Sequence, residues 1–250
     1  MNLSEKIDKT SYYKNGFLII DNFIKNFLNP VSRLAPTCTL NVDGNMSTVV
    51  HNNSNIFLKA EYKLDWDDHT YDCVLCLPDT NAERNIHVFP EEEDIQLKHD
   101  DNCLKYNNGK GDRFTYHLFD DSLALRSPFD FDKIKEITNW SKFTLTREKN
   151  NSILKALPFV TDSCKLYLYS EDNNVFADLT DKKLQNVDSY TSLIGDDFSG
   201  EKIPGELILD IELFRLISTL NFENIQVYIN NDFKMLKLKV VLDKAELVFV

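Results

Sequence analysis

The 250-residue sequence is poor in the residues that punctuate loop-rich and fibrous proteins, with only 7 glycines and 7 prolines. This scarcity excludes collagen-like and linker-rich architectures. No apolar run approaches the roughly 18 residues that a membrane-spanning helix needs, and the first residues lack the apolar stretch of a secretory signal. We therefore expect a soluble, cytoplasmic protein with no membrane partner.

Cysteine is sparse and odd in number, with five residues scattered at positions 38, 73, 76, 103 and 164. Such a set suits reduced thiols better than a disulfide framework. Cys73 and Cys76 form a C-x-x-C motif that histidines could complete as a metal site. The motif lies in a predicted strand, however, where side chains three positions apart face opposite sides of the sheet. We expect core cysteines and no metal.

The signatures of common catalytic sites are also missing: the sequence has no G-x-S-x-G, no Walker loop and no dinucleotide-binding fingerprint. Acidic clusters in predicted turns, such as Asp100-Asp101, are the remaining candidates for a metal-dependent nuclease or hydrolase. In that alternative, alanine at both positions abolishes activity. No second carboxylate or histidine motif completes such a site, so we expect no enzyme, no catalytic residue and no cofactor.

Positive charge is in deficit, because 28 basic residues face 40 acidic ones and give a net charge of -12. The total disfavours nucleic acid as a partner. Exposed charges are nevertheless screened over about 8 Å in physiological salt, so a local basic surface can act while the remote surface is acidic. The placement of the basic residues therefore matters more than their number.

What the sequence does contain is a pattern repeated four times. In each copy an apolar run, predicted to be a strand, is followed by a helix-capping residue and then by apolar residues at helical spacing. Two more predicted strands flank a turn, and a third closes the copy. The caps are Asp21, Asp79, Thr146 and Asp210, and the turns are Asp43-Gly44, Asp101-Asn102, Asp172-Asn173-Asn174 and Asn231-Asp232.

The repeat predicts an α+β fold of four β-α-β-β-β units. Residues 120–135 fit none of the units and form a predicted connector. The units thus divide into two similar domains, residues 1–119 and 136–250, on either side of that connector.

The predicted helices direct basic residues away from their apolar faces. In the fourth helix, Leu213, Leu216, Ile217 and Leu220 share one face and Arg215 points away from it. In the third, Ile153, Leu154 and Leu157 point inward and Lys155 outward. The basic residues predicted on helix surfaces are Lys25, Arg84, Arg147, Lys149, Lys155 and Arg215. Acidic residues collect in loops instead, a segregation that suits phosphate contacts without base reading.

Taken together, these features resemble the DNA polymerase sliding clamps, a family that includes proliferating cell nuclear antigen. The size is most similar to the clamps of T-even-type bacteriophages. The resemblance covers nearly the whole chain and is strongest in residues 143–250. The first half departs from it through extra residues before Phe17, a prolyl break at Pro30 and Pro36, and a second helix with few apolar positions.

The resemblance implies that three chains join head to tail, so that twelve helices line a ring around duplex DNA. The six basic residues would then face the phosphates independently of sequence, and the ring would tether the DNA polymerase after a clamp loader had closed it. In a phage, this would happen in the cytoplasm of the host cell. The residues implied for a pocket that binds partner peptides are Leu123, Leu125, Phe129, Val248, Phe249 and Val250.

Two other interpretations stay open at this point. A β-rich viral assembly protein, with hairpins that pair between subunits, would show no dependence on DNA. A monomeric or dimeric factor could instead hold DNA by affinity, although such proteins need a more basic surface. In addition, the last three pocket candidates read equally well as core or edge-strand residues.

Overall fold

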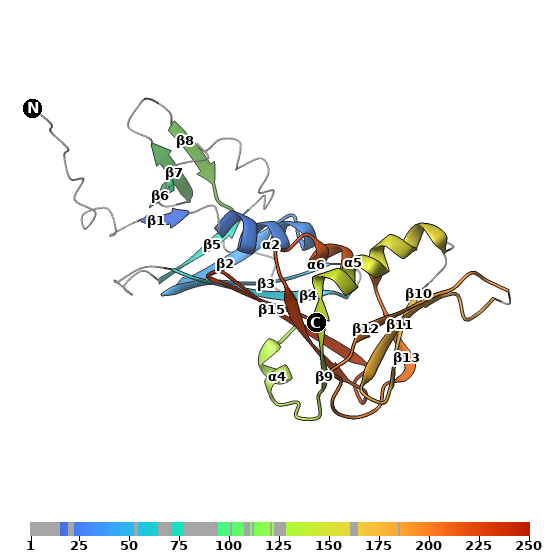
Figure 1. Cartoon of the computed structure of the whole chain (residues 1–250). Coiled ribbons are helices and arrows are strands. Elements are labelled where there is room, and N and C mark those ends of the chain that lie inside the picture. Colours follow the sequence, from blue (N-terminus) through green and yellow to red (C-terminus); the bar gives the residue numbers. More distant parts are fainter. Residues whose placement is uncertain are drawn as a thin grey trace, which may run out of the picture. The chain divides into compact units, whose positions relative to one another are not determined.

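The structure is a computed structural model of the chain (Figure 1). It describes residues 16–19, 23–52, 55–64, 72–77, 95–100, 102–107, 111, 113–120, 122, 129–160, 165–184 and 186–250. They belong to two compact units: residues 1–49 with 61–126, and residues 50–60 with 127–250.

The first unit contains the strands of the first two repeats, with β3 and β4 crossing its boundary. Its elements are β1 (Gly16–Ile19), η2 (Ile24–Leu28), α2 (Asn29–Leu34), β2 (Cys38–Asp43), β3 (Asn45–His51), β4 (Phe57–Lys63), β5 (Asp72–Leu77), β6 (Ile95–Asp100), β7 (Cys103–Asn107) and β8 (Arg113–His117). One antiparallel sheet has the order β1-β6-β7-β8, and β2 pairs with β3 and β5.

The predicted turn at Asp43-Gly44 joins β2 to β3. Gly44 has a φ of 63°, a backbone conformation that glycine adopts without steric cost. Side chains alternate between core and surface along both strands, and Val42 and Met46 are wholly buried. The turn residue and the alternation together fix which face of this hairpin enters the core.

The first helix is longer than the sequence predicts. A π-helical turn, η2, leads directly into α2, so the expected break at Pro30 is wrong. Pro30 is the second residue of α2, immediately after the π-helical turn, so the helix continues through the proline. Phe27 and Val31 are wholly buried, and the ring of Phe27 stacks on that of Phe23.

The second unit holds the complete third and fourth repeats, preceded by part of the connector. Its elements are α4 (Phe131–Lys135), β9 (Ser141–Thr146), α5 (Arg147–Ala156), η4 (Leu157–Phe159), β10 (Lys165–Glu171), β11 (Asn174–Thr180), β12 (Tyr190–Gly195), β13 (Pro204–Leu209), α6 (Ile211–Ser218), β14 (Asn224–Asn230), β15 (Met235–Leu242) and β16 (Ala245–Phe249). The predicted β-α-β-β-β order is confirmed in both repeats.

Antiparallel pairing organises the second unit. One sheet has the order β12-β11-β10-β13, and another runs β16-β15-β14-β9. The start of β4 lies beside the C-terminus, since Phe57 and Val250 exchange two backbone hydrogen bonds of 2.8 and 2.9 Å. A short segment from early in the sequence thus belongs to the unit built mainly by the second half of the chain.

Two of the four predicted helix caps are confirmed. The Thr146 hydroxyl accepts a hydrogen bond from Lys149 N at 3.2 Å, and the Asp210 carboxylate accepts one from Glu212 N at 2.9 Å. The other two predicted caps, Asp21 and Asp79, lie outside the described residues. So does the second predicted helix with Arg84.

Two of the cysteines that the structure describes are core residues, and Cys103 is only partly buried. Cys38 and Cys76 are buried, and burial raises the pKa of the Cys38 thiol to about 12, so this group stays protonated at neutral pH. Cys76 lies on β5, as predicted. Within the described ranges, no cluster of three or more His, Cys, Asp or Glu side chains is placed to hold a metal ion. None of the helices described there is long and apolar enough to cross a bilayer.

Candidate nucleic-acid interface and apolar pockets

Helices α5 and α6 pack against each other in the second unit, and α5 also packs on β9 and β12 (Figure 1). The inner face of α6 is apolar: Leu213, Leu216 and Ile217 are buried, as the periodicity predicts. Phe214 is buried too, and Arg215 is exposed. The helix therefore presents one basic side chain to solvent.

The inner face of α5 differs from the prediction. Ile153 is wholly buried, but Leu154 and Leu157 are only partly so. Asn150 is buried instead, and its Nδ2 lies 3.4 Å from the Phe214 carbonyl oxygen of α6. Apolar periodicity could not find this residue, because an amide in a helix–helix contact looks like a surface residue in the sequence.

The basic side chains of α5 differ in their exposure and in their hydrogen-bond partners. Arg147 is exposed and donates from Nη1 to Asn221 Oδ1 at 3.1 Å. Lys149 has only 23% of its side chain exposed, and its Nζ lies 3.1 Å from Asp196 Oδ2. Lys155 is exposed in the last turn. With Glu148 as the helix's one acidic residue, α5 carries three positive charges against one negative.

Helix α6 is electrically balanced. Arg215 forms an ion pair with Glu212 one turn earlier on the same helix. Glu212 is not among the residues predicted from the sequence, although its i,i+3 spacing to Arg215 is a recognisable signal for such a pair. The basic character of the two helices therefore comes from α5.

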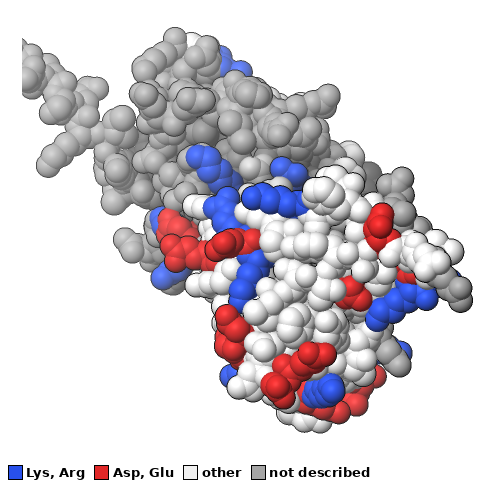
Figure 2. Space-filling view, turned by 45° about the vertical axis from the view of Figure 1, so that its right-hand side comes forward, with Lys and Arg blue, Asp and Glu red and all other residues white. Residues whose placement is uncertain are grey.

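The remaining predicted basic residues lie in the first unit. Lys25 is exposed on η2, and Arg84 lies outside the described residues. On the face of the molecule that Figure 2 shows, Lys and Arg side chains are interspersed with Asp and Glu. Such a mixed surface favours weak, screened contacts with phosphates over tight binding.

The loop after β12 holds Lys149 in place. The Asp197 carboxylate accepts hydrogen bonds from Thr144 N at 2.8 Å and from Thr144 Oγ1 at 2.6 Å. Partial burial by itself raises the pKa of Asp197, but the hydrogen bonds from Thr144 outweigh it and leave that pKa below its ordinary value. Asp197 thereby ties the loop to β9, and the neighbouring Asp196 is kept beside α5.

A large pocket, which we call the apolar pocket, lies in the second unit. It has a volume of about 920 Å³, and its lining includes Phe57, Phe129, Met235, Leu236 and Val250. The rings of Phe57 and Phe129 stack with centroids 4.4 Å apart. Of the predicted pocket residues, this surface includes Phe129 and Val250.

The other predicted pocket residues have different positions. Phe249 is wholly buried, because alternation along β16 turns it into the core, so it is not available to a peptide. Val248 is half-buried and does not line the apolar pocket. Leu123 and Leu125 lie outside the described residues. Phe57 and Met235 are not among the predicted pocket residues, because nothing local in the sequence indicates that β4 and β15 reach the connector.

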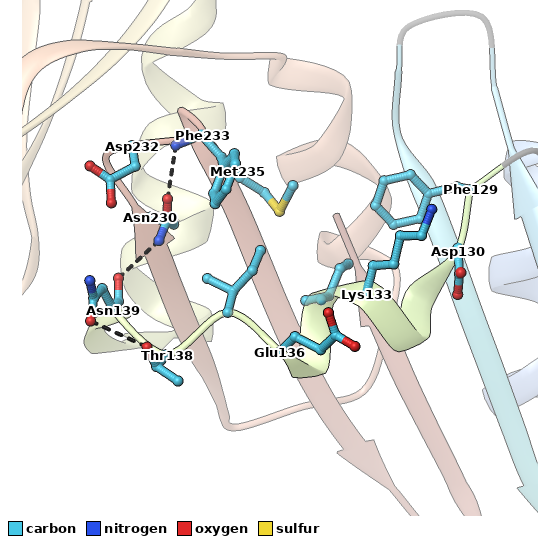
Figure 3. Close-up of a pocket in the computed structure, with 12 residues that line it drawn as sticks. Phe129, Asp130, Lys133, Glu136, Thr138, Asn139, Asn230, Asp232, Phe233 and Met235 are labelled. Carbon is cyan, nitrogen blue, oxygen red and sulfur yellow. Dashed lines mark hydrogen bonds between the residues drawn. The ribbon is translucent and has the colours of Figure 1, made fainter.

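A second pocket, which we call the connector pocket, lies between α4 and the turn from β14 to β15 (Figure 3). Its volume is about 670 Å³, and Ile134, Ile137 and Met235 contribute apolar surface to it. Asn230 is 1% exposed and links two segments that line this pocket. It donates to Asn139 O at 3.0 Å and accepts from Phe233 N at 2.9 Å.

Among the described strands, each four-stranded sheet has two edge strands: β1 and β8 in the first unit, and β12 and β13 in the second. Side chains at alternate positions of β8 are exposed, and Leu193 of β12 is an exposed apolar residue. Edge strands of this kind carry backbone groups that can pair with another chain.

Comparison with known proteins identifies the fold. No family model and no curated protein matches the sequence. Among solved structures, a putative DNA polymerase III beta subunit from Eubacterium rectale matches 94% of this chain with a TM-score of 0.73 and 12% identity, and the match covers 64% of that chain. The PCNA of A. fulgidus, in a structure with the C-terminal region of FEN-1, matches 94% with a TM-score of 0.70 and 12% identity, and 96% of it is covered.

A further match is the Helicobacter pylori beta clamp bound to a DNA ligase peptide, with a TM-score of 0.62 and 14% identity over 93% of this chain. The match covers 65% of that protein, so the present chain spans about two thirds of the bacterial clamps. At these identities the similarity is one of fold, and that fold is the α+β DNA clamp fold.

Proposed function

We propose that this chain, which has the DNA clamp fold, is a sliding clamp that encircles duplex DNA and tethers a DNA polymerase for processive synthesis. The observation that carries the proposal is the basic outer face of α5 within that fold. A clamp needs a surface that contacts phosphates without reading bases. Topological linkage of the ring to the DNA, rather than affinity, keeps the polymerase on its template, and the clamp itself needs no catalytic site.

In this proposal Arg147, Lys149 and Lys155 supply most of the phosphate contacts, and Arg215, Lys25 and Arg84 supplement them. Contacts of this kind are independent of sequence and weaken as salt rises, because binding releases counterions from the DNA. Asp196 and Glu212 compete with the phosphates for Lys149 and Arg215. This competition keeps the contacts loose enough for sliding.

Three copies form the proposed ring, joined head to tail through the edge strands β8 and β12. Pairing between edge strands extends a sheet across a subunit boundary and covers backbone groups that would otherwise stay open. The match to 96% of a PCNA chain, against 64% of a bacterial beta subunit, supports a subunit of the shorter kind. A relationship to the T-even phage clamps, and action in the host-cell cytoplasm, belong to the same proposal.

Polymerase and clamp loader are the proposed protein partners, and the apolar pocket is their proposed docking site. Phe129 and Val250 form part of its lining, with Leu123, Leu125 and Val248 as further candidates. The solved clamps that bind a FEN-1 region and a DNA ligase peptide support a role of this type. Residues 120–135 serve as the connector between the proposed domains 1–119 and 136–250.

Two measurements on the full chain test the clamp proposal. Light scattering across a dilution series should show a species of three 29.0 kDa chains. After loading, the protein should stay on circular duplex DNA and leave linear duplex by its ends.

The double variant Arg147→Glu/Lys155→Glu should lose retention on circles, whereas the matched control Lys183→Glu/Lys202→Glu, which leaves α5 intact, should keep it. A strict monomer at high concentration would overturn the self-closing ring. Equal retention on circles and on linear DNA would indicate a factor that holds DNA by affinity.

A further inference from the structure

The two pockets of the second unit adjoin each other. Phe129, Phe233 and Met235 line both of them. Phe233 is 64% exposed, which is unusual for a large apolar residue on a tight turn. One extended segment of a partner can therefore fill both pockets and cover Phe233.

The charges that line the two pockets have opposite signs. The connector pocket has three exposed carboxylates, Asp130, Glu136 and Asp232, and one ammonium group, Lys133. The apolar pocket has three basic residues, Lys165, Lys234 and Arg215, of which Arg215 is paired with Glu212, and one carboxylate, Asp210. A partner segment that spans both pockets thus meets a net negative surface on the α4 side and a net positive surface on the other.

From this arrangement we infer that the connector pocket binds a lysine- or arginine-rich stretch of a partner protein, adjacent to an apolar anchor that enters the apolar pocket. The inference rests on the proposed function, because it takes the docked partner from there. What it adds is the chemistry of the partner's flank and the direction in which the segment lies. Charge complementarity of this kind fixes orientation and partner choice more than it adds affinity.

The acidic groups are held in position before a partner arrives. The Asp130 carboxylate caps α4 by accepting from Asp132 N at 3.0 Å. The two hydrogen bonds of Asn230 fix the turn that carries Asp232 and Phe233 relative to Asn139, in the segment after α4 (Figure 3). A preformed surface loses little conformational entropy when a partner binds. The nearby Asp132 pairs with Lys135 at 2.7 Å, so these two charges offset each other.

The same charges argue against nucleic acid at this place. The three carboxylates would repel phosphates. A basic peptide could instead form an exposed ion pair with each of the three carboxylates, and no charge would have to be buried. Exposed pairs are weak singly, so the apolar anchor must supply most of the affinity. The connector pocket is therefore a site that selects partners.

A displayed library of random 12-residue peptides, selected on the immobilised full-length protein, tests the inference. Selected peptides are synthesised with a fluorophore, and their Kd is measured by anisotropy against four proteins. These are the wild type, Phe129→Ala, the charge reversal Glu136→Lys/Asp232→Lys, and the control reversal Asp188→Lys/Glu201→Lys at exposed acidic residues outside both pockets.

We expect the peptides that depend on Phe129 to be enriched in Lys and Arg on one side of an apolar core. Their Kd should rise roughly 10-fold in the Glu136→Lys/Asp232→Lys variant at low salt, and less at high salt, because exposed pairs are screened. The control reversal should leave the Kd within about 2-fold of the wild type.

Two results would overturn the inference, and they differ from each other. If Phe129-dependent peptides show no basic excess, or bind the reversed variant as tightly as the wild type, the basic flank is wrong and the apolar pocket still stands as a docking site. If no selected peptide depends on Phe129, the docking site of the proposed function fails as well.

Discussion

Helices α5 and α6 occupy equivalent places in successive repeats and pack against each other, yet they divide their tasks differently. Each begins at a capping side chain directly after a strand. The inner face of α6 is apolar, and its one exposed basic residue is paired with Glu212. The inner face of α5 includes Asn150, and the helix carries three basic residues, of which Arg147 and Lys155 are exposed. Helix α6 therefore contributes mainly buried apolar side chains, and helix α5 contributes most of the basic ones.

The strongest test of this difference concerns the core that both helices share. Ile153 of α5 and Ile217 of α6 are wholly buried. Replacement of either by alanine should lower the free energy of unfolding by about 2–5 kcal/mol, because methylene burial is lost and a cavity is left. Urea unfolding measures both. If Ile153→Ala alone lowered the free energy of unfolding by less than about 1 kcal/mol, α5 would contribute basic residues but little to the stability of the core.

The next test concerns DNA. In Arg147→Gln/Lys155→Gln, the slope of log Kd against log salt should decrease by roughly 0.9 for each phosphate contact removed. In Arg215→Gln the slope should decrease by less than about 0.9, because Glu212 already offsets the charge of Arg215. Anisotropy with a short fluorescent duplex at several salt concentrations gives the slopes. Equal slopes per removed charge would refute the assignment of the basic surface to α5.

A smaller effect is expected at Asn150. Its Oδ1 is buried without a hydrogen-bond partner in the structure, and its Nδ2 makes one long contact with the Phe214 carbonyl. Because an unsatisfied buried carbonyl is costly, Asn150→Leu should raise the free energy of unfolding by about 1 kcal/mol, as read from the urea midpoint. If the variant were instead less stable by about 1 kcal/mol, the hydrogen bond from Asn150 to α6 would stabilise the fold by more than the unpaired Oδ1 costs.

The smallest effect concerns Asp197, whose carboxylate is exposed and therefore screened. Its pKa is lower in the folded than in the unfolded chain, so the stabilisation is complete above the unfolded value and disappears as pH falls through the folded one. Below about pH 4, the wild type should lose slightly more stability than Asp197→Asn. Urea midpoints between pH 5 and pH 2.5 compare the two. Parallel curves would exclude this contribution.

Much of the architecture follows from local patterns in the sequence. The hairpin at Gly44, the caps Thr146 and Asp210, and the inner face of α6 were all predictable, because each depends on neighbouring residues whose chemistry favours one conformation. The break expected at Pro30 is wrong, because the helix passes from a π-helical turn into α2 through the proline, and Phe27 and Val31 on either side of it are both buried in the core.

The sequence by itself determined the repeat, the strand alternation and the identity of the basic residues, since these depend on spacing along the chain. Only the tertiary structure decided that Asn150 enters the contact between two helices, that Asp196 reaches Lys149, and that Phe57 stacks on Phe129. Each of these contacts joins residues far apart in the chain. Pairing over such distances is set by strand register and packing, for which a single sequence carries no local signal.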